Sequence, residues 1–68
     1  MSLAIWTIYR YPSDFPTSYI ARKWVSGVPT HDIFRGESLE DIREKIPEGL
    51  YCLPREAGDD PVIVETWF

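Results

Sequence analysis

The sequence predicts a small α+β domain, in which a mostly antiparallel sheet of four strands carries one helix on one face. Three observations predict this class. Runs rich in β-branched and aromatic residues lie towards both ends of the chain, one segment has helical periodicity, and prolines and glycines separate these segments. At 68 residues the chain has room for one domain, residues 1–68. The predicted order of elements is β-β-β-α-β.

The first strand is expected over residues 3–9, where apolar side chains occupy both alternating sets. A strand that is apolar on both sides is usually a central one. Two prolines then enforce a turn over residues 11–16. A second strand is expected over residues 18–26 and a short third strand over residues 30–34, with Gly27-Val28-Pro29 as the turn that makes them a hairpin.

The helix has the clearest signals in the chain. Ser38 is a good N-cap, and Pro47 ends the helix at Ile46 because a residue before proline resists the α region. One apolar stripe at spacings of three and four supports this assignment. It consists of Leu39, Ile42 and Ile46.

The last strand is expected over residues 62–68, which are again apolar on both faces. If the first three strands form a meander, the helix returns the chain so that the last strand runs parallel to the first. The two strands would then be neighbours, joined by a right-handed crossover. Residues 50–53 form either a loop or a short fifth strand, and in the alternative arrangement this strand pairs antiparallel with the last one.

A helix this short cannot cover both faces of the sheet, although both faces receive large apolar side chains. Two interpretations remain open. Loops around residues 12–16 and 47–61 fold over the second face, or that face is exposed and contacts a protein partner or a second copy of the chain. The candidate binding residues are aromatic or basic: Trp6, Arg22, Lys23, Trp24, Arg35 and Trp67.

Charge is unevenly distributed along the chain. Residues 1–36 hold four Lys and Arg against two acids, residues 37–68 hold three against nine, and the net charge is −4. An acidic protein lacks the electrostatic character that general nucleic-acid binding needs. The alternative to a protein-interaction module is a regulator that contacts nucleic acid through a basic hairpin patch. That patch would contain Arg10, Arg22, Lys23 and Arg35.

No pattern in the sequence points to catalysis, and we expect neither an enzyme nor a bound metal, cofactor or small-molecule substrate. His31 and Asp32 are adjacent, so on a strand their side chains point to opposite faces. Cys52 lies in an apolar run and is expected to be buried and unreactive. The acidic residues Glu56, Asp59 and Asp60 lack the spacing of a calcium loop.

The expected location is the cytoplasm, without membrane contact. One cysteine in a chain of this size is typical of a reducing compartment. The first residues lack the basic start and long apolar run of a signal peptide, and no apolar run approaches the roughly 20 residues of a membrane-spanning helix.

Several short motifs carry a resemblance to other proteins. They are Trp6-Thr7-Ile8-Tyr9, Pro12-Ser13-Asp14-Phe15-Pro16, Ala21-Arg22-Lys23-Trp24, the Pro29-Thr30 turn and the ending at residues 59–67, Asp-Asp-Pro-Val-Ile-Val-Glu-Thr-Trp. Over most of its length the chain resembles a group of short, uncharacterised bacterial proteins. The resemblance implies a bacterial origin and a self-contained gene product. It brings no activity, ligand or catalytic residue with it.

Overall fold

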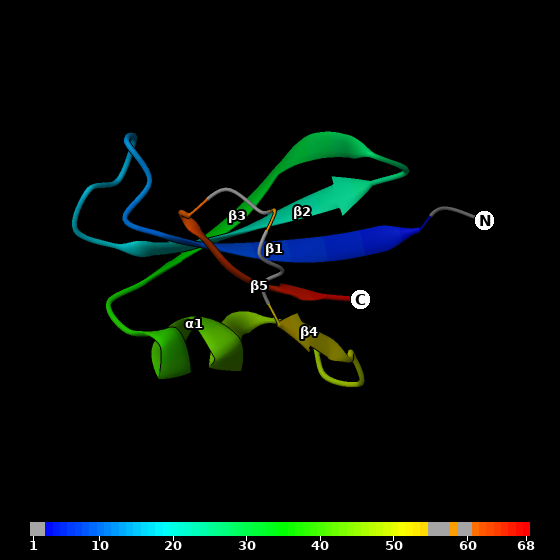
Figure 1. Cartoon of the computed structure of the whole chain (residues 1–68). Coiled ribbons are helices and arrows are strands. Elements are labelled where there is room, and N and C mark those ends of the chain that lie inside the picture. The colour runs from blue at the N-terminus through cyan, green and yellow to red at the C-terminus, as the bar shows by residue number, and fades with distance from the viewer. Residues whose placement is uncertain (1–2, 55–57, 59–60) are drawn as a thin grey trace.

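The computed structural model describes residues 3–54, 58 and 61–68 (Figure 1). Within these residues, five strands form one open antiparallel sheet in the order β3-β2-β1-β5-β4, and one helix packs against it. The α+β class is therefore confirmed, with five strands where the sequence predicted four and allowed a fifth. The elements in chain order are β1 (Ala4–Arg10), β2 (Tyr19–Val25), β3 (Val28–Gly36), α1 (Leu39–Lys45), β4 (Cys52–Pro54) and β5 (Ile63–Trp67).

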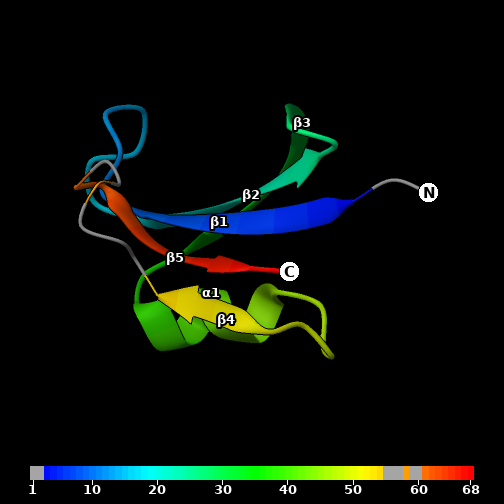
Figure 2. The ribbon, with the colours of Figure 1, turned by 45° about the vertical axis from the view of Figure 1, so that its right-hand side comes forward.

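The first and last strands are neighbours, as predicted, but the predicted parallel direction is wrong. β5 pairs antiparallel with β1, and β4 pairs antiparallel with β5. The chain enters β4 after α1, and this extra passage along the sheet reverses the direction in which β5 runs. The alternative with a short fifth strand is therefore confirmed, and β4 forms the sheet edge beside β5 (Figure 2).

The β2–β3 hairpin closes one position earlier than predicted. Ser26 and Gly27 both have positive φ, at 51° and 80°, which is the backbone that a two-residue hairpin turn requires. Pro29 is not part of the turn and lies within β3. β3 is an edge strand, where the missing N–H of a proline is tolerated. β3 is also longer than the predicted 30–34.

The helix signals are confirmed in detail. The backbone N–H of Asp41 donates to Ser38 Oγ at 3.1 Å, and Asp41 Oδ2 accepts from the backbone N–H of Glu37 at 3.1 Å. Ile46 is the C-cap. Ile42 is fully buried in the core, where α1 packs on the sheet. Gly36 ends β3 close to α1, and a Cβ there would lie only 3.1 Å from Ile42 N.

Cross-strand pairing assigns side chains to two faces of the sheet. The helix face packs against α1, and one of its rows is Pro54, Glu65, Ile8, Ala21 and Phe34. The opposite face is called the open face. Its central row crosses all five strands and consists of Leu53, Thr66, Thr7, Arg22 and Ile33. Two further open-face rows are Ile5, Trp24 and Pro29, and Ile63, Tyr9, Ile20 and Arg35.

Candidate functional site

Large apolar side chains are exposed on the open face. Leu53 and Ile33, at opposite ends of the central row, are 46% and 39% exposed. Tyr51 and Phe68 extend this surface beyond β4 and β5. Their backbones exchange two hydrogen bonds, and their ring centroids lie 6.5 Å apart. The exposed apolar side chains of the open face therefore lie at its two edges, and most of them gather at β4 and β5.

A loop covers one end of the open face. Its turn is closed by the Phe15 N–H, which donates to Pro12 O at 2.8 Å, and by the Ser18 N–H, which donates to Phe15 O at 3.2 Å. The structure thus combines loop cover at one end of the second face with exposure elsewhere, and contact with a partner stays a prediction. The 12–15 segment folds back over the sheet, while Leu53 and Ile33 stay exposed. Of the second predicted covering loop, residues 55–57 and 59–60 lie outside the described part of the chain.

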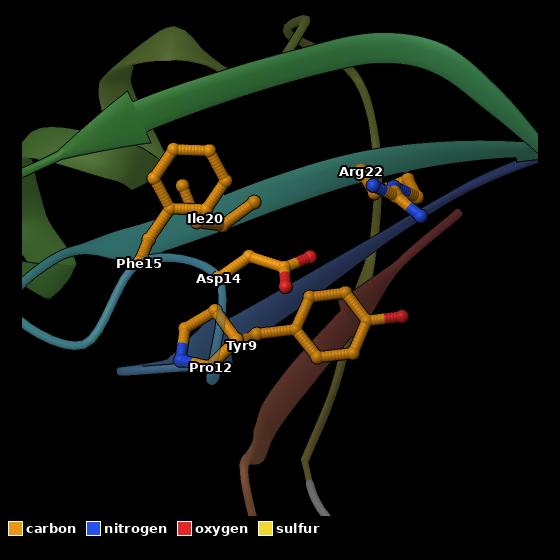
Figure 3. Close-up of a pocket in the computed structure, with 6 residues that line it drawn as sticks. All are labelled: Tyr9, Pro12, Asp14, Phe15, Ile20 and Arg22. Carbon is orange, nitrogen blue, oxygen red and sulfur yellow. The ribbon is translucent and has the colours of Figure 1, made fainter.

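The loop and the sheet line an open, amphipathic pocket of about 220 Å³. The side chains that line it are shown in Figure 3: Tyr9, Pro12, Asp14, Phe15, Ile20 and Arg22. Ile20 is 3% exposed and belongs to the sheet beneath the loop. The Asp14 carboxylate, the Tyr9 hydroxyl and Arg22 lie towards one end, whereas Phe15 and Ile20 lie towards the other (Figure 3). We call this the loop pocket.

Strand alternation separates the predicted binding residues. Arg22, Trp24 and Arg35 belong to the open face. The other three share one row of the helix face, where Trp6 on β1 lies between Lys23 on β2 and Trp67 on β5. Trp6 is only 6% exposed and stacks on Phe34 with centroids 5.1 Å apart. It therefore belongs to the core and not to a contact surface.

The four cations of the predicted basic patch do not gather on one face. Arg22 and Arg35 belong to the open face, whereas Arg10 lies opposite Tyr19 and Lys23 lies opposite Trp6, both on the helix face. Arg35 Nε donates to Ser18 Oγ at 3.0 Å, and its guanidinium lies 5.5 Å from the centre of the Phe15 ring. The Arg22 guanidinium has no hydrogen bond or ion pair with any described residue, and only the backbone of Arg22 is paired, within the sheet.

A second hollow lies beside the start of α1. Its volume is about 550 Å³, and Asp41 and Lys45 are among its lining residues. Lys45 Nζ lies 3.6 Å from Asp41 Oδ2 and also donates to the carbonyl of Arg35. Because these charged groups already bind one another or the backbone, they offer a ligand less than the Arg22 guanidinium, which binds none of the described residues.

A polar cluster that links α1, β4 and β5 was not predicted from the sequence. Glu65 is 3% exposed on the helix face. Its Oε1 accepts from Arg43 Nη2 at 2.7 Å and from Arg43 Nε at 2.9 Å, while its Oε2 accepts from Cys52 Sγ at 2.7 Å. The expectation that Cys52 is buried is wrong, because its strand is the exposed edge of the sheet. The partners are 22 and 13 residues away from Glu65, so no local pattern reveals them.

The pKa of the Cys52 thiol is raised from 9.0 to about 11. Desolvation is the largest cause, followed by the hydrogen bond to Glu65 and the negative charge of that carboxylate. At pH 8 we expect iodoacetamide to alkylate Cys52 about tenfold more slowly in the folded protein than in the denatured chain. The raised pKa lowers the thiolate fraction roughly 100-fold. The more basic thiolate is a better nucleophile, and this raises its rate constant about tenfold, so the net rate falls about tenfold. Mass spectrometry of timed samples measures both rates.

Two outcomes check this account of the thiol. Glu65→Gln removes the charge, so the alkylation rate of the folded variant should lie closer to the rate of its denatured chain. Equal alkylation rates in folded and denatured wild-type protein would contradict the raised pKa. Because folding raises this pKa, the neutral thiol favours the folded state. This contribution is complete below pH 9 and is lost as the pH rises through about 11.

The histidine and the acidic residues are the remaining candidates for chemistry. His31 and Asp32 are exposed and lie where the β2–β3 register shifts, beside Thr30, whose Oγ1 donates to Lys23 O at 2.7 Å. No group of three or more potential metal ligands occurs among the described residues. Glu56, Asp59 and Asp60 lie outside them.

Comparison of the chain with protein-family models, curated proteins and solved structures gives no significant match. Across the residues that the structure describes, no helix has both the length and the apolar character that crossing a membrane requires.

Proposed function

We propose that this protein is a small, non-catalytic interaction module that binds a protein partner through the open face. The observation that carries the proposal is the exposure of Leu53 and Ile33 at the two ends of the central row, together with that of Tyr51 and Phe68. Large apolar side chains that share one face of a small domain are typical of a contact surface. Self-association through the same face is the competing outcome.

The sheet edges are less suited to partner binding than the open face. Along β3, Pro29 lacks a donor, the register shifts between Arg22 and Trp24, and Lys45 Nζ occupies the carbonyl of Arg35. β4 has only three residues and ends at Pro54. Short strands, prolines and irregular pairing are the features by which proteins block edge-to-edge pairing. These features favour contact through side chains of the open face.

A hydrophobic-surface dye tests the proposal on the native protein. We expect ANS fluorescence to rise with the wild-type chain and to fall by more than half in the double variant Ile33→Thr, Leu53→Thr, because both substitutions remove apolar area from the open face. Val28→Thr is the matched control, since Val28 is 61% exposed but lies opposite Val25 on the helix-face side. Its dye binding should match the wild type.

Light scattering separates the two kinds of partner. Molar mass is measured over a wide concentration range at two salt concentrations. A monomer that binds the dye supports a different protein as the partner, and a salt-insensitive dimer that excludes the dye assigns the open face to a second copy. A monomer that binds no dye contradicts the proposed function.

A further inference from the structure

The loop pocket joins apolar walls to the Arg22 guanidinium, which pairs with none of the residues that the structure describes. We infer that it takes an aromatic or large aliphatic side chain of the partner, and that Arg22 pairs with a carboxylate next to that side chain. The partner segment is therefore both acidic and apolar. This inference rests on the proposed function and names the chemistry that the open face recognises.

The size and lining of the loop pocket suit a side chain. Its volume is about 220 Å³, below the roughly 300–1,000 Å³ of sites that enclose small molecules. Phe15, Pro12 and Ile20 provide an apolar lining, and the polar groups point towards the other end (Figure 3). An apolar side chain held there keeps its own backbone and flanking residues at the open face, where Arg22 lies.

Arg22 supplies the specific polar contact. It is half-buried between Thr7 and Ile33 in the central row, and no hydrogen bond or ion pair joins its guanidinium to a described residue. A guanidinium partly removed from water gains most from a charged acceptor, and its planar fork matches a carboxylate with two parallel hydrogen bonds. A carboxylate of the partner would satisfy this donor group.

Charge also distinguishes an acidic segment from a second copy. The strands contribute two cations to the open face, Arg22 and Arg35, and the loop contributes one acid, Asp14. Two copies that met face to face would bring like charges together, which opposes association. The acidic side chains of α1, Glu40 and Glu44 among them, lie beyond the sheet on the helix face. Among the described residues, the open face therefore carries two cations against one acid, in a chain whose net charge is −4.

The test is an NMR titration of the ¹⁵N-labelled full chain with short peptides. The probe is Ac-Glu-Phe-Glu-NH₂, and the controls are Ac-Lys-Phe-Lys-NH₂ and Ac-Glu-Ala-Glu-NH₂. We expect the acidic aromatic peptide to shift the amides of Tyr9, Ile20 and Arg22 with a Kd on the order of 1 mM at low salt. Both controls should bind at least about threefold more weakly, because each lacks one half of the recognised pair.

Three variants test the polar half of the recognised pair. Arg22→Gln should weaken the probe about three- to tenfold, and Arg22→Lys should weaken it less because it keeps the charge but loses the fork. Asp14→Asn should strengthen binding up to about threefold, since it removes the one acid among the described residues that line the pocket. Unchanged amide spectra away from the pocket confirm that each variant is folded.

The overturning results are equally specific. The inference fails if the basic peptide binds as tightly as the acidic one, or if Arg22→Gln leaves the Kd unchanged. It also fails if a short oligothymidylate shifts the same amides more strongly, or if these amides shift with protein concentration alone. Failure of the peptide while ANS still binds the open face leaves the proposed function standing. Absence of dye binding overturns the proposed function itself.

Discussion

Replacing Ile42 by alanine is expected to lower the free energy of unfolding by about 2–5 kcal/mol, the usual cost of removing a buried aliphatic side chain. Ile42 is fully buried where α1 meets the sheet. A chain of 68 residues has a total stability of only about 3–10 kcal/mol at the usual value per residue. The loss is therefore a large fraction of the total stability, and the urea midpoint of the variant is expected to fall well below that of the wild type. Urea denaturation followed by circular dichroism measures the loss.

Glu44→Ala provides the matched control for Ile42→Ala. Glu44 is exposed on the same helix, and alanine is at least as good a helix former as glutamate. Its unfolding midpoint should stay close to that of the wild type. If Ile42→Ala costs less than about 1 kcal/mol, the contact between α1 and the sheet is not the core of this fold.

Replacing Arg43 by methionine is expected to destabilise the protein by about 1–3 kcal/mol. The substitution leaves the Glu65 carboxylate, which is 3% exposed, without its cation. Breaking a fully buried ion pair costs more, but the Arg43 side chain is 46% exposed, so water screens part of the effect. Urea denaturation at pH 7 measures the difference.

The double variant Arg43→Met, Glu65→Gln tests whether the effect comes from the unpaired charge. Removing the carboxylate together with its cation should restore part of the loss, so the double variant is expected to be more stable than Arg43→Met alone. Strict additivity of the two single substitutions would show that the pair contributes nothing through its interaction.

Local signals predicted the elements whose boundaries depend on nearby residues. Ser38 and Pro47 define the two ends of α1 because capping and proline geometry act within one helical turn. Alternation along β1 predicted its central position in the same way. The direction of β5 could not be predicted from such signals, since it depends on whether the three residues of β4 pair at the sheet edge.

The candidate site was predicted only in part, for a similar reason. Alternation shows that Arg22 and Lys23 point to opposite faces, but only long-range pairing shows which of them faces α1. Glu65 lies between Val64 and Thr66 in the sequence and has no local partner. Its burial depends on Arg43, which α1 supplies. The loop pocket likewise requires the 12–15 segment to fold over Ile20.

The central row of the open face has a consequence for how a partner can lie on it. Read across the strands, it presents Leu53, then two threonine hydroxyls, then Arg22 and finally Ile33. The cation lies next to one apolar end and is separated from the other by the two hydroxyls. A segment that crosses this row therefore meets a different sequence of groups from each end. Binding along it would select one orientation of the bound chain, so a peptide of reversed sequence and identical composition should bind less well.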